Sequence, residues 1–200
     1  MLVLYVLLFF VLNIVLTRFL FKKTKLLIIP SLVSCLISLA HSVIMFMYAE
    51  FYGVYSDNFI CLSAGYFIYD MFNTLNKKIT KESIVYIIHH VFALMAYYIV
   101  LTNEDVRKSL PILTFAVGKI ELTSAISHFV VIFDLIQYKR GMTILKIFNI
   151  ITWIYYRLIS TYLLRESLFA GNLIYASIAI IIISVAGLLN FIKNLFDENN

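Results

Sequence analysis

The stretch Ser63–Glu121 decides the fold and reads SAGYFIYDMFNTLNKKITKESIVYIIHHVFALMAYYIVLTNEDVRKSLPILTFAVGKIE. Its three apolar runs carry Asp70, then His89 and His90, then Lys119 and Glu121. A charge at the centre of a membrane-spanning helix costs about 2.5–3.5 kcal/mol on translocon scales, so such groups usually face a partner or a cavity. The question of function is therefore what these side chains face.

The composition around this stretch is that of a membrane protein. Of 200 residues, 62% are hydrophobic and 14% are charged, against about 45–50% and about 25% in globular domains. So little polar surface cannot cover a soluble fold, and two prolines and six glycines suit continuous helices. We interpret the net charge of +5 as a signal of membrane topology, and we expect no nucleic-acid partner.

A spanning helix needs about 20 mostly apolar residues. Seven segments qualify, at about 1–21, 27–49, 59–75, 84–101, 109–136, 142–164 and 170–194. The third is the weakest, because it is short and interrupted by Asp70. We therefore predict an all-α bundle of about seven transmembrane helices; the alternative is six spans with one terminal segment lying in the interface.

The loop charges predict the direction of these spans. The first, third and fifth loops hold the basic residues Arg18, Lys22, Lys23, Lys25, Lys77, Lys78, Lys81, Lys139, Arg140 and Lys146. The second loop has Glu50 and Asp57 and no Lys or Arg. By the positive-inside rule, the basic loops and the C-terminus are cytosolic. The N-terminus is then outside or lumenal, and the first segment is an uncleaved helix, since it lacks a basic leader.

This topology places several polar residues at one depth. Asp70 and the His89–His90 pair lie five to six residues from the predicted cytosolic ends of their helices, about 8 Å deep at 1.5 Å per residue. His128 lies at a similar level, with Glu121 nearer the middle. We expect one polar layer that opens toward the cytosol.

Adjacent histidines point about 100° apart on a helix, so we expect one to face a cavity and the other to bond a neighbouring helix. One interpretation is a histidine base or nucleophile oriented by Asp70 or Glu121. The other is a hydrogen-bonded pair that holds the bundle together.

Two further helices complete the candidate site. Glu121, Ser124 and His128 share one face of the fifth segment by their spacing, while Lys119 points nearly opposite and either pairs elsewhere or extends poorly from mid-membrane toward the interface. Arg157 is predicted to form a salt bridge with Glu121 or Asp70, or else to bind an anionic headgroup. We interpret His41 and Asn190 as core hydrogen-bonding residues.

The sequence gives little support for a metal site or for a disulfide bond. Four histidines are too few for a membrane di-iron oxygenase, and no i, i+4 histidine pair supports a single ion. We expect no metal and no bound cofactor. Cys35 and Cys61 are expected to be small apolar residues without a disulfide.

Several motifs together resemble the TLC-domain family, which includes ceramide synthases, translocon-associated membrane proteins and small lipid-regulating proteins. They are SCLISLAH (Ser34–His41), SAGYFIYDM (Ser63–Met71), YIIHHVFAL (Tyr86–Leu94), GKIELTSAISHF (Gly118–Phe129), Arg157 and the region of Leu189–Asn190. The resemblance covers roughly residues 25–195. It implies a first helix and basic loop over 1–24 and a TLC domain over 25–200, in the endoplasmic reticulum.

The resemblance also implies a function in lipid chemistry. In the ceramide synthase branch, an acyl group passes from acyl-CoA to the amine of a sphingoid base, which would make His89 and His90 the reactive pair. Asp70 or Glu121 would orient it, and His41, Ser124, His128 and Arg157 would line the cavity. Glu121 stands where the synthases have an Asp-rich stretch, so the chain resembles the smaller members more. Membrane lipids are the expected partners and acyl-CoA a candidate substrate; the alternative is a non-catalytic scaffold.

Overall fold

A computed structural model describes the chain except for residues 25–27, 78, 139–140 and 170–200. In the described part, all regular structure is helical. The helices are α1 (Leu2–Thr24), α2 (Ile29–Tyr52), α3 (Asp57–Leu75), α4 (Lys81–Thr102), α5 (Glu104–Lys108), α6 (Leu110–Leu135) and α7 (Met142–Phe169). The predicted all-α class is therefore confirmed. The predicted seventh span, 170–194, and Asn190 lie outside the described residues.

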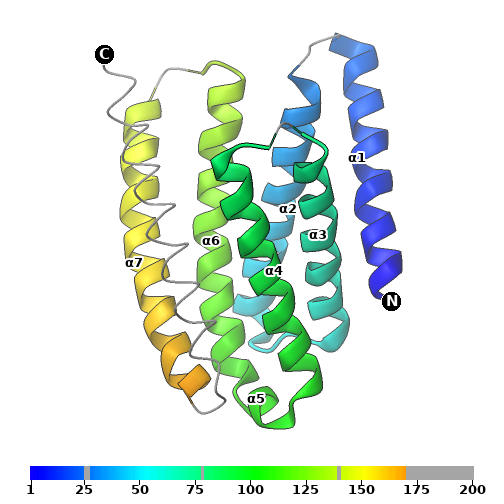
Figure 1. The fold of residues 1–200 in the computed structure, drawn as a ribbon. Coiled ribbons are helices and arrows are strands. Elements are labelled where there is room, and N and C mark those ends of the chain that lie inside the picture. The colour runs from blue at the N-terminus through cyan, green and yellow to red at the C-terminus, as the bar shows by residue number, and fades with distance from the viewer. Residues whose placement is uncertain (25–27, 78, 139–140, 170–200) are drawn as a thin grey trace.

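Six long helices run alternately up and down, so α1, α3 and α6 all end at the same end of the bundle (Figure 1). Four of them are long and apolar enough to cross a membrane: Leu2–Lys22, Ile29–Tyr52, Ser83–Thr102 and Leu110–Leu135. These helices indicate an integral membrane protein. The count of seven spans and the outside N-terminus remain predictions.

Several charged residues assigned to loops by the sequence lie in helices instead: Arg18, Lys22 and Lys23 in α1, Glu50 in α2, Asp57 in α3, Lys81 in α4 and Lys146 in α7. Glu50 belongs to α2, which continues to Tyr52 and ends at Gly53. Gly53 has a φ of +69° and donates its backbone N–H to the carbonyl of Ala49, the usual end of a helix at a left-handed glycine. Lys146 lies in the first turns of α7 and is buried, with 9% of its surface exposed.

The short helix α5 was not predicted, although its capping signal is present in the sequence. The side chain of Asn103 accepts hydrogen bonds from the N–H groups of Asp105 and Val106. Asp105 follows the cap, and Arg107 and Lys108 lie at the other end. This charge order complements the helix dipole.

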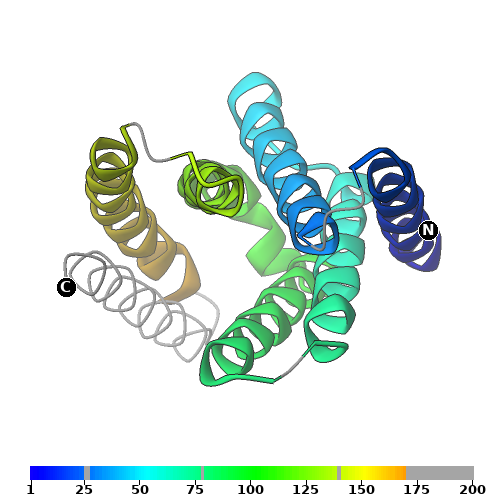
Figure 2. The ribbon, with the colours of Figure 1, turned by 90° about the horizontal axis from the view of Figure 1, so that it is seen from above.

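The helices pack in an order that differs from their sequence order. α2 packs against α6, α6 against α7, α1 against α3, and α3 against α4; Figure 2 shows α2 and α6 adjacent near the centre. Glycine permits two of these contacts. A Cβ added at Gly118 of α6 would lie 2.5 Å from Cβ of Ala49, and one added at Gly65 of α3 would lie 2.7 Å from Cβ of Tyr5. Small residues at such crossings let helices approach closely in membranes.

Lys119 finds its partner at the α2–α6 contact. Its ammonium pairs with the carboxylate of Glu50, one position beyond the Gly118–Ala49 crossing, with 17% of the lysine side chain and 39% of the glutamate side chain exposed. The ammonium also lies 4.9 Å from the centre of the Phe115 ring. The charge of Lys119 is therefore paired at a helix–helix contact on the side of α6 opposite Glu121.

Candidate functional site

A histidine–carboxylate pair joins α3 to α4. Nε2 of His90 lies 2.9 Å from Oδ2 of Asp70, and the two side chains are 3% and 12% exposed. The equal depths estimated for these residues predicted that they could meet, and they do. Asp70 is the carboxyl group that contacts His90, whereas Glu121 lies on α6.

The second nitrogen of His90 determines where its proton lies. Nδ1 is 2.6 Å from the backbone carbonyl of Tyr86, one turn earlier in α4. A carbonyl only accepts hydrogen bonds, so Nδ1 must carry a proton. Nε2 and Asp70 then share the remaining proton, either as a neutral imidazole with a carboxylic acid or as an imidazolium with a carboxylate. Both nitrogens of His90 are therefore engaged.

His89 differs from its neighbour. It is half-buried, and its ring contacts the rings of Phe67 and His90 edge-on, at centroid distances of 6.1 and 5.6 Å. No hydrogen bond of His89 is seen among the described residues. The two histidines thus differ as adjacent positions on a helix predict, and within the described part of the chain the nitrogens of His89 have no hydrogen-bond partner.

The polar face of α6 meets Arg157 of α7. Arg157 donates from Nε to Oγ1 of Thr123 at 3.1 Å and from Nη2 to Oγ of Ser124 at 3.0 Å. Its guanidinium carbon lies 4.7 Å from the ring centre of Trp153. The predicted salt bridge of Arg157 with Glu121 or Asp70 is not among the contacts described.

Glu121 and His128 flank these hydroxyls on α6. Glu121 is buried, with 7% of its surface exposed. His128 is half-buried. The charge of Arg157 lies near enough to influence Glu121, His128 and His89.

His41 lies in a separate chain of hydrogen bonds. Its Nε2 is 2.9 Å from Oγ of Ser63, which is 3.0 Å from the hydroxyl of Tyr97. The imidazole stacks on Tyr66 at 3.8 Å. His41, Ser63 and Tyr97 therefore link α2, α3 and α4, as the interpretation of His41 as a core residue predicted.

The α2–α3 contact carries further polar pairs of this kind. Asn73 donates to Ser34 at 2.7 Å, and Tyr66 donates to Ser38 at 2.8 Å. With His41, the positions on α2 recur every three or four residues and so follow one helix face. This row of hydrogen bonds fixes α3 on α2, and with it the position of Asp70.

Sequence reasoning did not include four residues that belong to these clusters: Ser63, Tyr97, Thr123 and Asn149. A spacing signal existed for Tyr97, which lies seven positions after His90 and therefore on the same face of α4. Thr123 lies beside Ser124 on α6. Asn149 accepts a hydrogen bond from Ser127 at 3.1 Å, while its buried Nδ2 has no partner among the residues that the structure describes.

Among the residues that the structure describes, no group of three or more His, Cys, Asp or Glu side chains is arranged to hold a metal ion. Cys35 and Cys61 are free thiols, as expected. The site therefore consists of imidazoles, two buried carboxyl groups, a guanidinium and several hydroxyls, a set suited to proton transfer and to binding of polar headgroups.

The chain is similar to TLC domain-containing protein 1 of Gallus gallus. The two are 28% identical over 104 residues, which covers 44% of this chain and 41% of the chicken protein. The match thus spans less than half the length of that relative. No family model matches the chain, and no solved structure matches it. The similarity is therefore to part of a TLC domain-containing protein, and the apolar helices indicate a membrane protein.

Proposed function

We propose that the chain belongs to the TLC-domain family, with its TLC domain over 25–200, and that it binds or processes membrane lipids at a polar site inside the bilayer. The observation that carries this proposal is the buried His90–Asp70 pair with His89, which has no described hydrogen bond, beside it. Two imidazoles and a carboxyl group are costly within a membrane, and such groups usually mark a functional site. The similarity to a TLC domain-containing protein supports the same conclusion.

The enzymatic form of this function is transfer of an acyl group from acyl-CoA to a lipid amine. The amine nitrogen attacks the thioester carbonyl, an amide bond forms, and the carbon–sulfur bond breaks to release the CoA thiol. His89 takes the proton of the amine, because its nitrogens are available. His90, held by Asp70 and the Tyr86 carbonyl, positions the pair. Arg157, with Ser124, His128 and Glu121 around it, balances developing negative charge.

An acyl-transfer assay tests this form directly. The full chain is expressed in membranes that lack endogenous ceramide synthases and is supplied with labelled acyl-CoA and a sphingoid base. We expect new amide product with the wild-type chain and none with His89→Ala. A matched change at a second half-buried position of α4, Ala93→Ser, should retain the product. Equal product from wild type and His89→Ala, both correctly inserted, would overturn the acyltransferase proposal.

The second candidate function is a non-catalytic lipid-handling protein or scaffold. The observation that favours it is that both nitrogens of His90, and the polar atoms joining α2 to α3, are already used between helices. In this case, His89→Gln and His90→Gln should leave the membrane phenotype unchanged, because glutamine retains hydrogen bonding without acid–base chemistry.

For either function we propose residence in the endoplasmic reticulum, membrane lipids as the partners, and no metal or bound cofactor. Co-localisation of the tagged full chain with an endoplasmic reticulum marker tests the location.

A further inference from the structure

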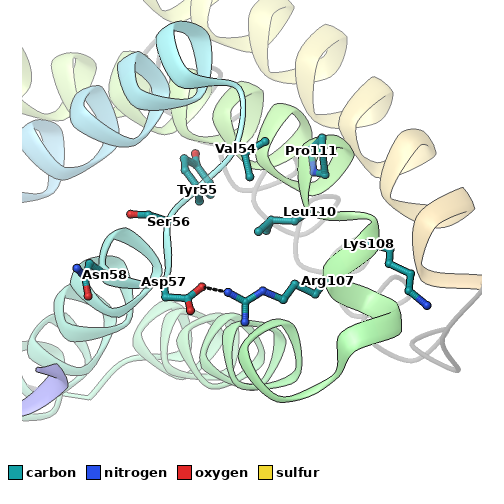
Figure 3. A pocket seen from close by; sticks show the side chains of 9 residues that line it. All are labelled: Val54, Tyr55, Ser56, Asp57, Asn58, Arg107, Lys108, Leu110 and Pro111. Carbon is teal, nitrogen blue, oxygen red and sulfur yellow. Dashed lines mark hydrogen bonds and ion pairs between the residues drawn. The ribbon is translucent and has the colours of Figure 1, made fainter.

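A pocket lies where the α2–α3 turn meets α5 and the start of α6 (Figure 3). It has a volume of about 770 Å³ and is lined by Val54, Tyr55, Ser56, Asp57, Asn58, Arg107, Lys108, Leu110 and Pro111. Asp57 and Asp70 stand at opposite parts of α3, about 20 Å apart at 1.5 Å per residue. The pocket is therefore distinct from the site proposed above, and its function does not depend on that proposal.

The inner wall of this pocket is fixed by hydrogen bonds. Tyr55 is only 3% exposed. Its backbone N–H donates to Oγ1 of Thr114 at 3.0 Å, and its hydroxyl donates to the carbonyl of Met45 at 3.0 Å. Leu110 adds a buried apolar surface at the start of α6. These hydrogen bonds hold the α2–α3 turn against α6, so this wall of the pocket is preformed.

An exposed ion pair spans the pocket. Arg107 of α5 reaches across to Asp57 at the start of α3 (Figure 3), with Nη2 2.5 Å from Oδ1. The two side chains are 45% and 51% exposed. An exposed pair of this kind is worth about 0–1 kcal/mol, so a ligand that offers better partners can separate it at little cost.

The charges of this pair indicate what such a ligand carries. An anion alone would satisfy Arg107 but face the carboxylate of Asp57, and a cation alone would face the guanidinium. A molecule with both charges can place its anionic group on Arg107 and its cationic group on Asp57, so that no charge is left unpaired. α3 and α6 both begin at the pocket, and the positive ends of their dipoles favour a phosphate there.

We propose that this pocket binds a zwitterionic phospholipid headgroup, a phosphate carrying an ammonium group. Arg107 holds the phosphate in a charge-assisted, forked hydrogen bond, and Asp57 accepts from the ammonium. Pockets for small ligands occupy about 300–1,000 Å³, and this one has room for a headgroup. Its place beyond the ends of α2 and α4 is where lipid headgroups lie if those helices cross a bilayer.

The structure offers a matched control on the same short helix. Lys108 lines the edge of the pocket and carries the same charge as Arg107, but its ammonium points away from the Asp57–Arg107 pair (Figure 3) and pairs with Asp105 at 2.7 Å. Arg107→Gln and Lys108→Gln therefore remove equal charge, and only the first removes a group that spans the pocket.

The test measures binding of short-chain phosphatidylethanolamine to the purified full chain in detergent, with phosphatidylglycerol of the same chain length and soluble O-phosphoethanolamine as comparison probes. We expect Arg107→Gln to weaken phosphatidylethanolamine binding at least about tenfold, the loss of one charged hydrogen bond. Lys108→Gln should change it less than about threefold, within the effect of an exposed charge.

Asp57→Asn separates a zwitterion from a simple anion. For a zwitterionic ligand this change removes the ammonium partner and weakens binding of phosphatidylethanolamine. Tighter binding of phosphatidylglycerol and unchanged binding of phosphatidylethanolamine in Asp57→Asn would overturn the proposal. So would equal effects of Arg107→Gln and Lys108→Gln. Binding of O-phosphoethanolamine as tight as that of the lipid would support the proposed charges and assign a soluble source.

Discussion

At the scale of single residues, the His89–His90 pair shows how position on one helix divides two identical side chains. His90 points at α3 and has a partner on each nitrogen. His89, one position earlier, is half-buried and has no described hydrogen bond. An adjacent pair in an apolar run predicts this split, because the two directions differ by about 100°. It does not predict which histidine is held; that depends on the location of Asp70 in the folded bundle.

We expect His90→Ala to destabilise the fold more than His89→Ala. It leaves Asp70 buried without its partner, a loss of about 1–3 kcal/mol in the free energy of unfolding. His89→Ala removes no described hydrogen bond and should cost less. Denaturant unfolding of the purified chain in mixed micelles measures both.

The control is the double variant His90→Ala with Asp70→Ala. Because both partners are removed together, its cost should be smaller than the sum of the two single changes. Strict additivity would show that the pair contributes nothing beyond its separate side chains.

At the scale of helices, the long apolar segments predict their own secondary structure well. The six described long helices begin and end within a few residues of the predicted limits, apart from the C-terminal end of α7. Apolar periodicity did not predict α5, because a helix of five residues is too short to show a periodic pattern. The pairing of helices is harder to predict, because apolar residues occur all around a run such as Leu110–Leu135, beside its polar positions, and their pattern does not select a neighbour. The contact of α2 with α6 depends on where Gly118 meets Ala49.

This crossing supports a prediction at the same scale. Gly118→Ala places a methyl group 2.5 Å from the Cβ of Ala49, so the helices must separate, at a cost of about 1–3 kcal/mol for an overpacked contact. Adding Ala49→Gly removes the opposing Cβ and should recover most of the stability. The resistance of the full chain to unfolding in mixed micelles gives the comparison. If the double variant is no more stable than Gly118→Ala, the close approach of α2 and α6 is not the cause.

At the scale of the whole molecule, the alternation of helices places the loops in two sets. The ends of α1, α3 and α6 lie together, and α5 lies at the opposite end (Figure 1). Charge counting on the loops predicts the same division, since basic residues follow α1 and α3. Which of the two ends faces the cytosol depends on membrane insertion and is not a property of the packing.

Cysteine labelling determines that direction. In a background where Cys35 and Cys61 are replaced by Ser, Asn76→Cys and Glu104→Cys place one thiol at each end of the bundle. In sealed vesicles with the cytosolic face outward, an impermeant maleimide should label Asn76→Cys at once and Glu104→Cys only after detergent is added. The reverse order would place the N-terminus in the cytosol, and immediate labelling of both would contradict the alternation.

The Glu50–Lys119 pair has a consequence for the making of this protein. Its two members are 69 positions apart along the chain. At a translation speed of about 5–20 residues per second, roughly 3–14 seconds pass between them. During that interval the carboxylate of α2 has no lysine to meet, and the lysine enters the membrane only once its acceptor is in place. The packing of α2 against α6 therefore forms only after α6 has been synthesised, later than the contacts among α1, α2 and α3.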